Sequence, residues 1–144
     1  RTMIAIGCDH GALELKEQLI EHLKKRGVEC KDYDTYTKDS CDYPVYAKKV
    51  AEAILSGECE EGILLCGTGI GMSMAANKIK GIRAALCSDC FSAQATKEHN
   101  NANVLCMGAR VIGPELAFRI ADTFLDSKFS NDERHIRRIS MLED

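Results

Sequence analysis

Short apolar runs alternate along this chain with segments whose apolar residues recur every three or four positions. Apolar runs of this length indicate strands, and the longer spacing indicates helices. In residues 11–26, for example, leucines recur at helical spacing, and Gly27 follows where a helix C-cap is favoured. Strands are expected at Met3–Cys8, Val28–Tyr33, Ile63–Cys66, Ile82–Cys87 and Asn103–Met107, and helices at 11–26, Tyr43–Leu55, 72–79, 89–98 and 113–125.

This alternation predicts an α/β fold, a three-layer Rossmann-like sandwich around a five-stranded, mostly parallel sheet. The 144 residues suit one domain, 1–144, with a polar loop at 34–42 and a charged tail at 127–144. The order of the last two strands stays open. Ligands bind at the carboxyl ends of such strands. The polar residues expected at that edge are Asp9, His10, Tyr43, Cys66 with its glycine loop, Ser88, Asp89 and Arg110.

Charge and hydropathy exclude several classes of function. The formal net charge is −3, so the chain lacks the basic character of a nucleic-acid-binding domain. No apolar run approaches the roughly 18 residues that span a membrane. We expect a cytoplasmic protein, in which the eight cysteines are reduced thiols. The single CxxC pair, Cys87 and Cys90, lacks the second pair or nearby histidines of a zinc site.

The stretch GILLCGTGIGMS, residues 62–73, places three glycines directly after an apolar run that ends in Cys66. Its GxGxG spacing departs from the GxGxxG of dinucleotide-binding loops, and it lacks the Gly-Lys-Ser/Thr of a nucleotide P-loop. The spacing from Cys66 to Ser73 matches that of small cysteine phosphatases. Met72, however, stands where those enzymes have the arginine that clamps the phosphate.

A strand-to-helix glycine loop can present its amide groups to an oxyanion, such as an enediolate. The same amides and the helix N-terminus are expected to favour the thiolate form of Cys66. A thiolate beside an oxyanion hole can act as a nucleophile or as a base toward carbon. The loop alone equally fits a buried strand-end cysteine beside a tight turn, so both interpretations stay open here.

Other polar residues are candidates for binding an anionic substrate. Asp9 and His10 follow the first strand, although an aspartate there can simply cap a helix. The stretch HNNAN, residues 99–103, stands between a helix and the last strand and can equally be a turn. Arg110 offers a guanidinium group for phosphate. Arg134 and Arg138 are four residues apart and share a face of a helix, which suits either a phosphate clamp or a solvated surface.

Five stretches occur together in this order: CDHGALELK, DYPVYA, GILLCGTGIGMSMAANKIKGIRAALC, KEHNNANVLCMGARVIG and RHIRRI. Together they resemble the type B ribose-5-phosphate isomerases, whose relatives act on galactose 6-phosphate and allose 6-phosphate. The resemblance runs from Met3 into the tail. One departure is visible: the family usually has Asp-His-Ala-Gly, and here Gly11 precedes Ala12.

The resemblance implies interconversion of ribose 5-phosphate and ribulose 5-phosphate without a metal or organic cofactor. Cys66 matches the base that moves a proton between C1 and C2 through an enediolate, in a loop that contains no acidic side chain. His99 matches the residue that helps to open the furanose ring, with Asp9 assisting. The remaining matches are the enediolate loop Gly67, Thr68, Gly69, Ile70 and Gly71, the phosphate contacts His10, Arg134 and Arg138, and the substrate contacts Tyr43, Asn100 and Arg110.

The resemblance also implies a homodimer or homotetramer in which two chains complete each site. Two alternatives remain at this point. The first is a hexose-6-phosphate isomerase with the same mechanism and a deeper pocket. The second is a non-catalytic sugar-phosphate binding module, which would have no need of a thiol in the anion nest.

Overall fold

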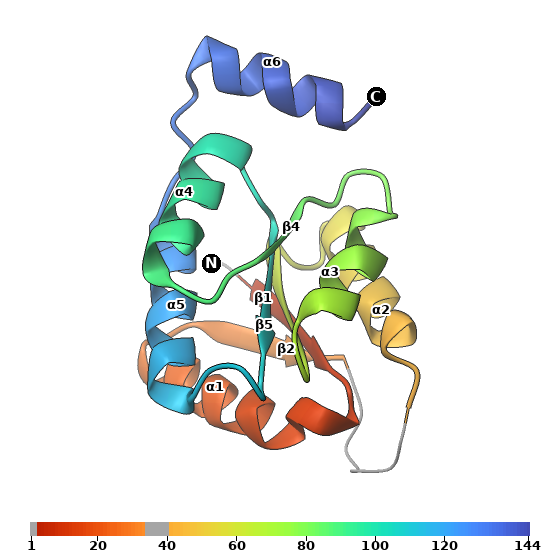
Figure 1. The fold of residues 1–144 in the computed structure, drawn as a ribbon, viewed down its shortest axis with the longest axis vertical. Coiled ribbons are helices and arrows are strands. Elements are labelled where there is room, and N and C mark those ends of the chain that lie inside the picture. The colour runs from red at the N-terminus through yellow and green to blue at the C-terminus, as the bar shows by residue number, and fades with distance from the viewer. Residues whose placement is uncertain (1–2, 34–40) are drawn as a thin grey trace.

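The computed structural model describes residues 3–33 and 41–144. They form a five-stranded sheet, in which every strand pairing is parallel, with five α-helices packed on its two faces in three layers and a sixth, α6, outside these layers (Figure 1). The elements are β1 (Met3–Cys8), the short 3₁₀ turn η1 (His10–Ala12), α1 (Leu13–Lys25), β2 (Glu29–Asp32), α2 (Tyr43–Leu55), β3 (Glu61–Cys66), α3 (Ile70–Asn77), β4 (Ala84–Leu86), α4 (Cys90–Asn100), β5 (Val104–Gly108), α5 (Pro114–Asp126) and α6 (Glu133–Leu142).

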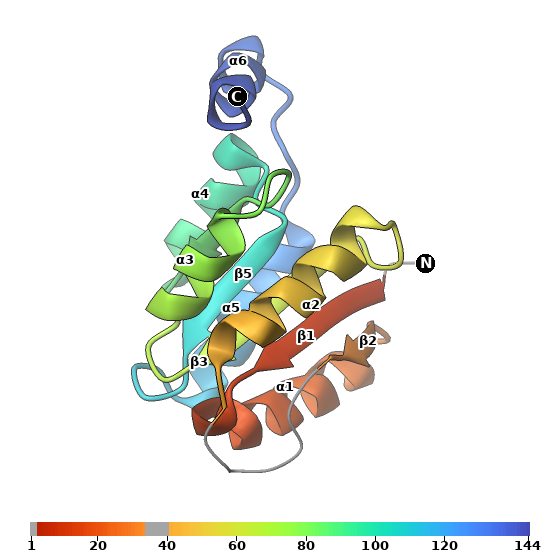
Figure 2. The same ribbon diagram turned by 90° about the vertical axis from the view of Figure 1, so that its right-hand side faces the viewer.

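The strand order is β2-β1-β3-β5-β4, which settles the order of the last two strands. The α/β sandwich expected from the sequence is therefore confirmed. Helices α2 and α3 cover one face of the sheet, and α1, α4 and α5 cover the other (Figures 1 and 2). The expected loop at 34–42 falls mostly outside the described residues.

Alternation along the central strands builds both cores. In β3, Ile63 and Leu65 pack toward α1 and α5, whereas Leu64 and Cys66 pack toward α2 and α3. Strand side chains point to opposite faces in turn, so a strand buried on both faces is apolar throughout. This register places the Cys66 side chain on the face that α2 and α3 cover.

Several expected boundaries were displaced by one or two residues, and two of these shifts have a clear physical cause. Helix α3 begins at Ile70 rather than at residue 72, because Gly69 adopts a left-handed conformation (φ +81°) and its carbonyl accepts the first helical hydrogen bond, from Ser73. Strand β4 is limited to Ala84–Leu86 because the preceding residues bond elsewhere. The Arg83 amide, for instance, donates to the side chain of Asn103.

The ends of the parallel strands form two opposite sides of the sheet, called here the carboxyl edge and the amino edge. All strands run in the same direction, so β1, β3 and β5 deliver their following loops to one carboxyl edge. Figure 2 shows α6 beyond the opposite, amino edge, above the last turn of α4. Strand β5 has five residues, and at about 3.3 Å per residue its ends lie roughly 13 Å apart, which is the separation of the carboxyl edge from the amino edge at this strand.

Candidate active site

The carboxyl edge of the sheet gathers most of the residues that the sequence singled out. The Asp9 amide donates to the carbonyl of Leu65, at 3.1 Å, which places the end of β1 beside the end of β3. On the other side of β3, the Ala109 amide donates to the carbonyl of Cys66, at 2.8 Å. The three central strands therefore end side by side around Cys66.

The glycine loop wraps the sulfur of Cys66. The amide of Gly69 donates to Cys66 Sγ at 3.1 Å, and Cys66 is only 5% exposed. This hydrogen bond orients the sulfur toward the amides of the glycine loop. The Ile70 amide, the first of α3, donates to Thr68 Oγ1 at 3.2 Å, and the Thr68 residue is exposed.

Gly69 allows this wrapping for a steric reason. A side chain there would place its Cβ 2.6 Å from Leu86 Cδ1 and 2.8 Å from the carbonyl carbon of Met107, and the backbone has a positive φ. Only glycine fits both constraints without strain. The close approach of the loop to β5 is thus what brings the Gly69 amide onto the sulfur.

Tyr43 covers the start of α3. A Cβ added at Gly71 would lie 2.7 Å from Tyr43 Cζ, so the ring rests directly on this glycine. The ring is 39% exposed and belongs to the first residue of α2. Its position makes it one wall of the space above the glycine loop.

Arg110 lies over the other side of the loop. Its amide donates to the carbonyl of Gly67 at 2.9 Å, and its Cδ would lie 3.5 Å from a Cβ added at Gly67. The guanidinium stem therefore runs along the loop, and the residue is exposed. A cation in this place can interact with an anion held by the loop.

Asp9 and His10 have their own partners at this edge. Asp9 Oδ1 accepts the amide of Gly11 at 2.9 Å and caps η1. His10 Nδ1 accepts the amide of Cys41 at 3.2 Å, and the Cys41 thiol lies 3.8 Å from the same nitrogen. Cys41 was not singled out in the sequence, because nothing local distinguishes it from the other thiols.

The remaining expected residues lie at the amino edge. His99 and Asn100 end α4, and Arg134 and Arg138 belong to α6 (Figure 1). The His99 ring lies 4.7 Å from the ring of His135, which joins these two helices. Burial and the neighbouring His99 and Arg134 charges lower the pKa of His135. Within one chain, the structure does not bring these four residues to Cys66.

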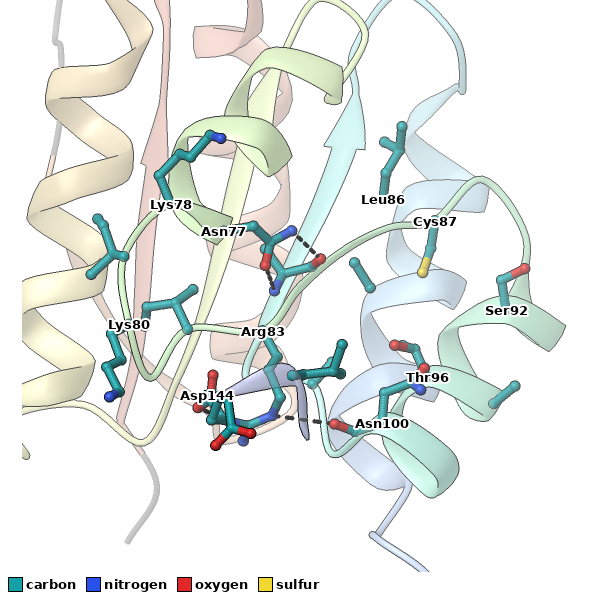
Figure 3. A pocket seen from close by; sticks show the side chains of 18 of the residues that line it. Asn77, Lys78, Lys80, Arg83, Leu86, Cys87, Ser92, Thr96, Asn100 and Asp144 are labelled. Atoms are coloured by element: carbon teal, nitrogen blue, oxygen red, sulfur yellow. Dashed lines mark hydrogen bonds and ion pairs between the residues drawn. The ribbon is translucent and has the colours of Figure 1, made fainter. Parts of the chain in front are cut away.

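A large open hollow of about 830 Å³ lies between α3 and α4 alongside the edge strand β4 (Figure 3). Cys66 does not line it, but Asn100 does, together with Arg83, Leu86 and Phe91. The Phe91 side chain is 81% exposed, which is unusual for a ring of this size. The hollow is therefore an incompletely covered surface that lies apart from Cys66.

The structure also bears on metals and membranes. Among residues 3–33 and 41–144, no three His, Cys, Asp or Glu side chains are placed to hold one ion. Within the same residues, no helix is long and apolar enough to cross a bilayer.

The sequence of this chain was compared with models of known protein families. The family model described as Ribose/Galactose Isomerase matches residues 4–142. The chain belongs to the ribose/galactose isomerase family. Family membership makes it an enzyme of the isomerase class, as the sequence motifs predicted.

Individual members of the ribose/galactose isomerase family are similar over nearly the whole chain. Ribose-5-phosphate isomerase B of Escherichia coli is 48% identical over 139 residues, which are 96% of this chain and 93% of that protein. A D-erythrulose-4-phosphate isomerase of Pectobacterium atrosepticum is 49% identical over 88% of this chain and 84% of its own. A ribose 5-phosphate isomerase structure from Thermotoga maritima has a TM-score of 0.97 and 52% identity, covering 99% of this chain and 98% of that one.

Proposed function

We propose that this isomerase interconverts ribose 5-phosphate and ribulose 5-phosphate, with Cys66 as the base. The hydrogen bond from the Gly69 amide to Cys66 Sγ carries the proposal, because it joins a thiol to an amide nest at the carboxyl edge of the sheet. A sugar-phosphate binding module needs no thiol at that point. The similarity to ribose-5-phosphate isomerase B supports the same conclusion.

In the proposed reaction, the Cys66 thiolate takes the C2 proton of the open-chain aldose. The electrons of the C–H bond form a C1–C2 double bond, and the carbonyl electrons move onto O1. The loop amides stabilise this enediolate, and Thr68 supplies a hydroxyl group. The C2 hydroxyl proton passes to O1, C2 becomes the carbonyl, and the Cys66 thiol returns its proton to C1. No covalent intermediate is needed.

The two edges of the sheet suggest how the site is completed. Ring opening by His99 and phosphate binding by Arg134 and Arg138 require these groups beside Cys66, and one chain holds them at the opposite edge. We infer that a second copy of the chain supplies them, in a homodimer or a larger assembly. The exposed apolar side chains of Leu86, Phe91 and Leu142 around the hollow provide a surface for such a partner.

The deciding experiment measures isomerisation of ribose 5-phosphate in the presence of EDTA. We expect turnover that is independent of added metal. Parallel measurement of kcat/KM on allose 6-phosphate and erythrose 4-phosphate tests the alternative chain lengths, which the tetrose-phosphate relative makes relevant. A higher kcat/KM on either of these would replace the pentose assignment. No exchange of solvent deuterium into any bound sugar would favour a binding module.

A further inference from the structure

Arg83 directly precedes β4, and its side chain makes four hydrogen bonds, to the end of α4 and to Glu143. Its Nε donates to the carbonyls of Asn100 and Asn101, at 3.2 and 3.0 Å. Its Nη2 donates to the Asn101 carbonyl at 2.9 Å. Figure 3 shows Arg83 directed toward Asn100 along the wall of the hollow.

These carbonyls stand at the end of α4, where a helix leaves its last carbonyl groups without helical partners. Asn101 closes the helix in a left-handed conformation (φ +46°), and its own amide donates back to Lys97. The Arg83 fork supplies the donors that the helix cannot provide. His99 is the second-last residue of this helix, so the fork holds the turn from which its ring projects.

The third nitrogen of the same guanidinium holds α6. Arg83 Nη1 donates to Glu143 Oε2 at 2.9 Å, and Glu143 is the residue that caps the end of α6. The beginning of α6 is attached separately, through His135, whose Nδ1 lies 2.8 Å from Ser130 Oγ. The amide of Ser130 in turn donates to the carbonyl of Glu98, in α4.

We propose that Arg83 is a positioning residue that sets the geometry of His99 and of the α6 arginines through two separable contacts. This inference rests on the proposed isomerase function. The fork on the α4 carbonyls orients the ring-opening histidine. The ion pair with Glu143 fixes α6, which carries Arg134 and Arg138 for the substrate phosphate. Arg83 itself touches no reacting atom in this scheme.

Two variants separate the contacts. Arg83→Lys keeps a cation for Glu143 and loses the planar fork, because an ammonium group cannot donate to both carbonyls in that geometry. Glu143→Gln keeps the fork and removes the charge that holds α6. Glu133→Gln, with the same charge change at the opposite end of α6, is the matched control.

The assays compare kcat and KM for ribose 5-phosphate, together with amide hydrogen exchange of α6. We expect Glu143→Gln to raise KM about tenfold with kcat nearly unchanged, since a charge-assisted hydrogen bond is lost only from the phosphate-binding helix. Its α6 amides should exchange faster. Arg83→Lys should lower kcat about tenfold with a smaller change in KM, and its α6 amides should stay protected.

Equal shifts of kcat and KM in both variants, or unchanged α6 exchange in Glu143→Gln, would overturn the proposal. The exchange measurement does not depend on the substrate. If the wild-type enzyme fails to turn over ribose 5-phosphate, the proposed function fails, and the exchange of α6 still decides whether Glu143 anchors this helix.

Discussion

The main-chain amide of Cys41 donates a hydrogen bond to Nδ1 of His10, at 3.2 Å. An amide N–H cannot accept, so Nδ1 carries no proton and Nε2 carries the N–H. The other nitrogen of the His10 ring, Nε2, is then a hydrogen-bond donor. If His10 contacts the substrate phosphate, it does so through Nε2–H.

This tautomer predicts a difference between two substitutions at His10. His10→Gln places an amide donor near the position of Nε2, whereas the shorter His10→Asn reaches only the position of Nδ1. We expect KM for ribose 5-phosphate to rise about tenfold less in His10→Gln than in His10→Asn, since one hydrogen bond to phosphate is retained. Cys41→Ser is the control, because it keeps the amide. Equal KM values for the Gln and Asn variants would contradict the assigned tautomer.

Cys66→Ala is expected to abolish proton transfer while leaving binding nearly intact. A positioned general base contributes about 10²–10⁴-fold to the rate, so kcat should fall by at least that factor. The measurement combines kcat with the affinity for a non-reacting sugar phosphate. Cys90→Ala, at the first residue of α4, is the matched control. Near-normal turnover by Cys66→Ala would remove Cys66 from the mechanism.

His99→Asn separates ring opening from proton transfer. Ribose 5-phosphate is mainly a furanose, whereas ribulose 5-phosphate is linear because its O5 carries the phosphate. We expect the variant to lose about 10²-fold or more in turnover of ribose 5-phosphate, in line with loss of a general acid or base. Exchange of solvent deuterium into C1 of ribulose 5-phosphate should fall much less. Equal losses in the two assays would count against a role in ring opening.

Gly71→Ala tests whether Tyr43 forms a wall of the site. The added Cβ would lie 2.7 Å from Tyr43 Cζ and must displace the half-exposed ring. The free energy of unfolding should change little, because the cost of displacing the ring is offset by the helix preference of alanine over glycine, up to about 1 kcal/mol. KM for ribose 5-phosphate should rise several-fold. Gly113→Ala, where an added Cβ meets nothing within 4 Å, should leave KM unchanged. An unchanged KM in Gly71→Ala would place Tyr43 outside the substrate site.

Lys97, in α4, and Glu61, the first residue of β3, form a largely buried ion pair, with Nζ 2.5 Å from Oε2. Lys97 Nζ also donates to the Phe124 carbonyl at 2.7 Å. Lys97→Met leaves the Glu61 carboxylate without its cation, and we expect a loss of about 3 kcal/mol in the free energy of unfolding.

Urea unfolding at a fixed protein concentration measures this loss. Burial raises the pKa of Glu61 even with Lys97 present, so the carboxylate is costly to keep charged without its partner. Adding Glu61→Gln to Lys97→Met should therefore recover part of the stability. Lys128→Met, at an exposed position, is the control. A double variant as unstable as Lys97→Met alone would argue against an electrostatic cause.

The order of helices and strands could be predicted from the sequence because hydrophobic periodicity is a local property. Alternation every two residues, or recurrence every three or four, depends only on neighbouring positions, and β1, α2 and β5 were located nearly to the residue. The cluster of Cys66 and its glycines was likewise visible as one continuous stretch. The strand-end rule then correctly gathered Asp9, His10, Cys66 and Arg110 at one edge.

Only the tertiary structure decided how distant segments meet. The insertion of β5 between β3 and β4 brings Gly108 against the backbone of Thr68 in the glycine loop, and no local pattern encodes this order. The contacts of Arg83 with Glu143 and of Cys41 with His10 join residues 60 and 31 positions apart. Sequence alone determined which chemical groups the chain carries and where its strands end. The packing of the helices decided which groups share an edge, because such contacts depend on the whole fold.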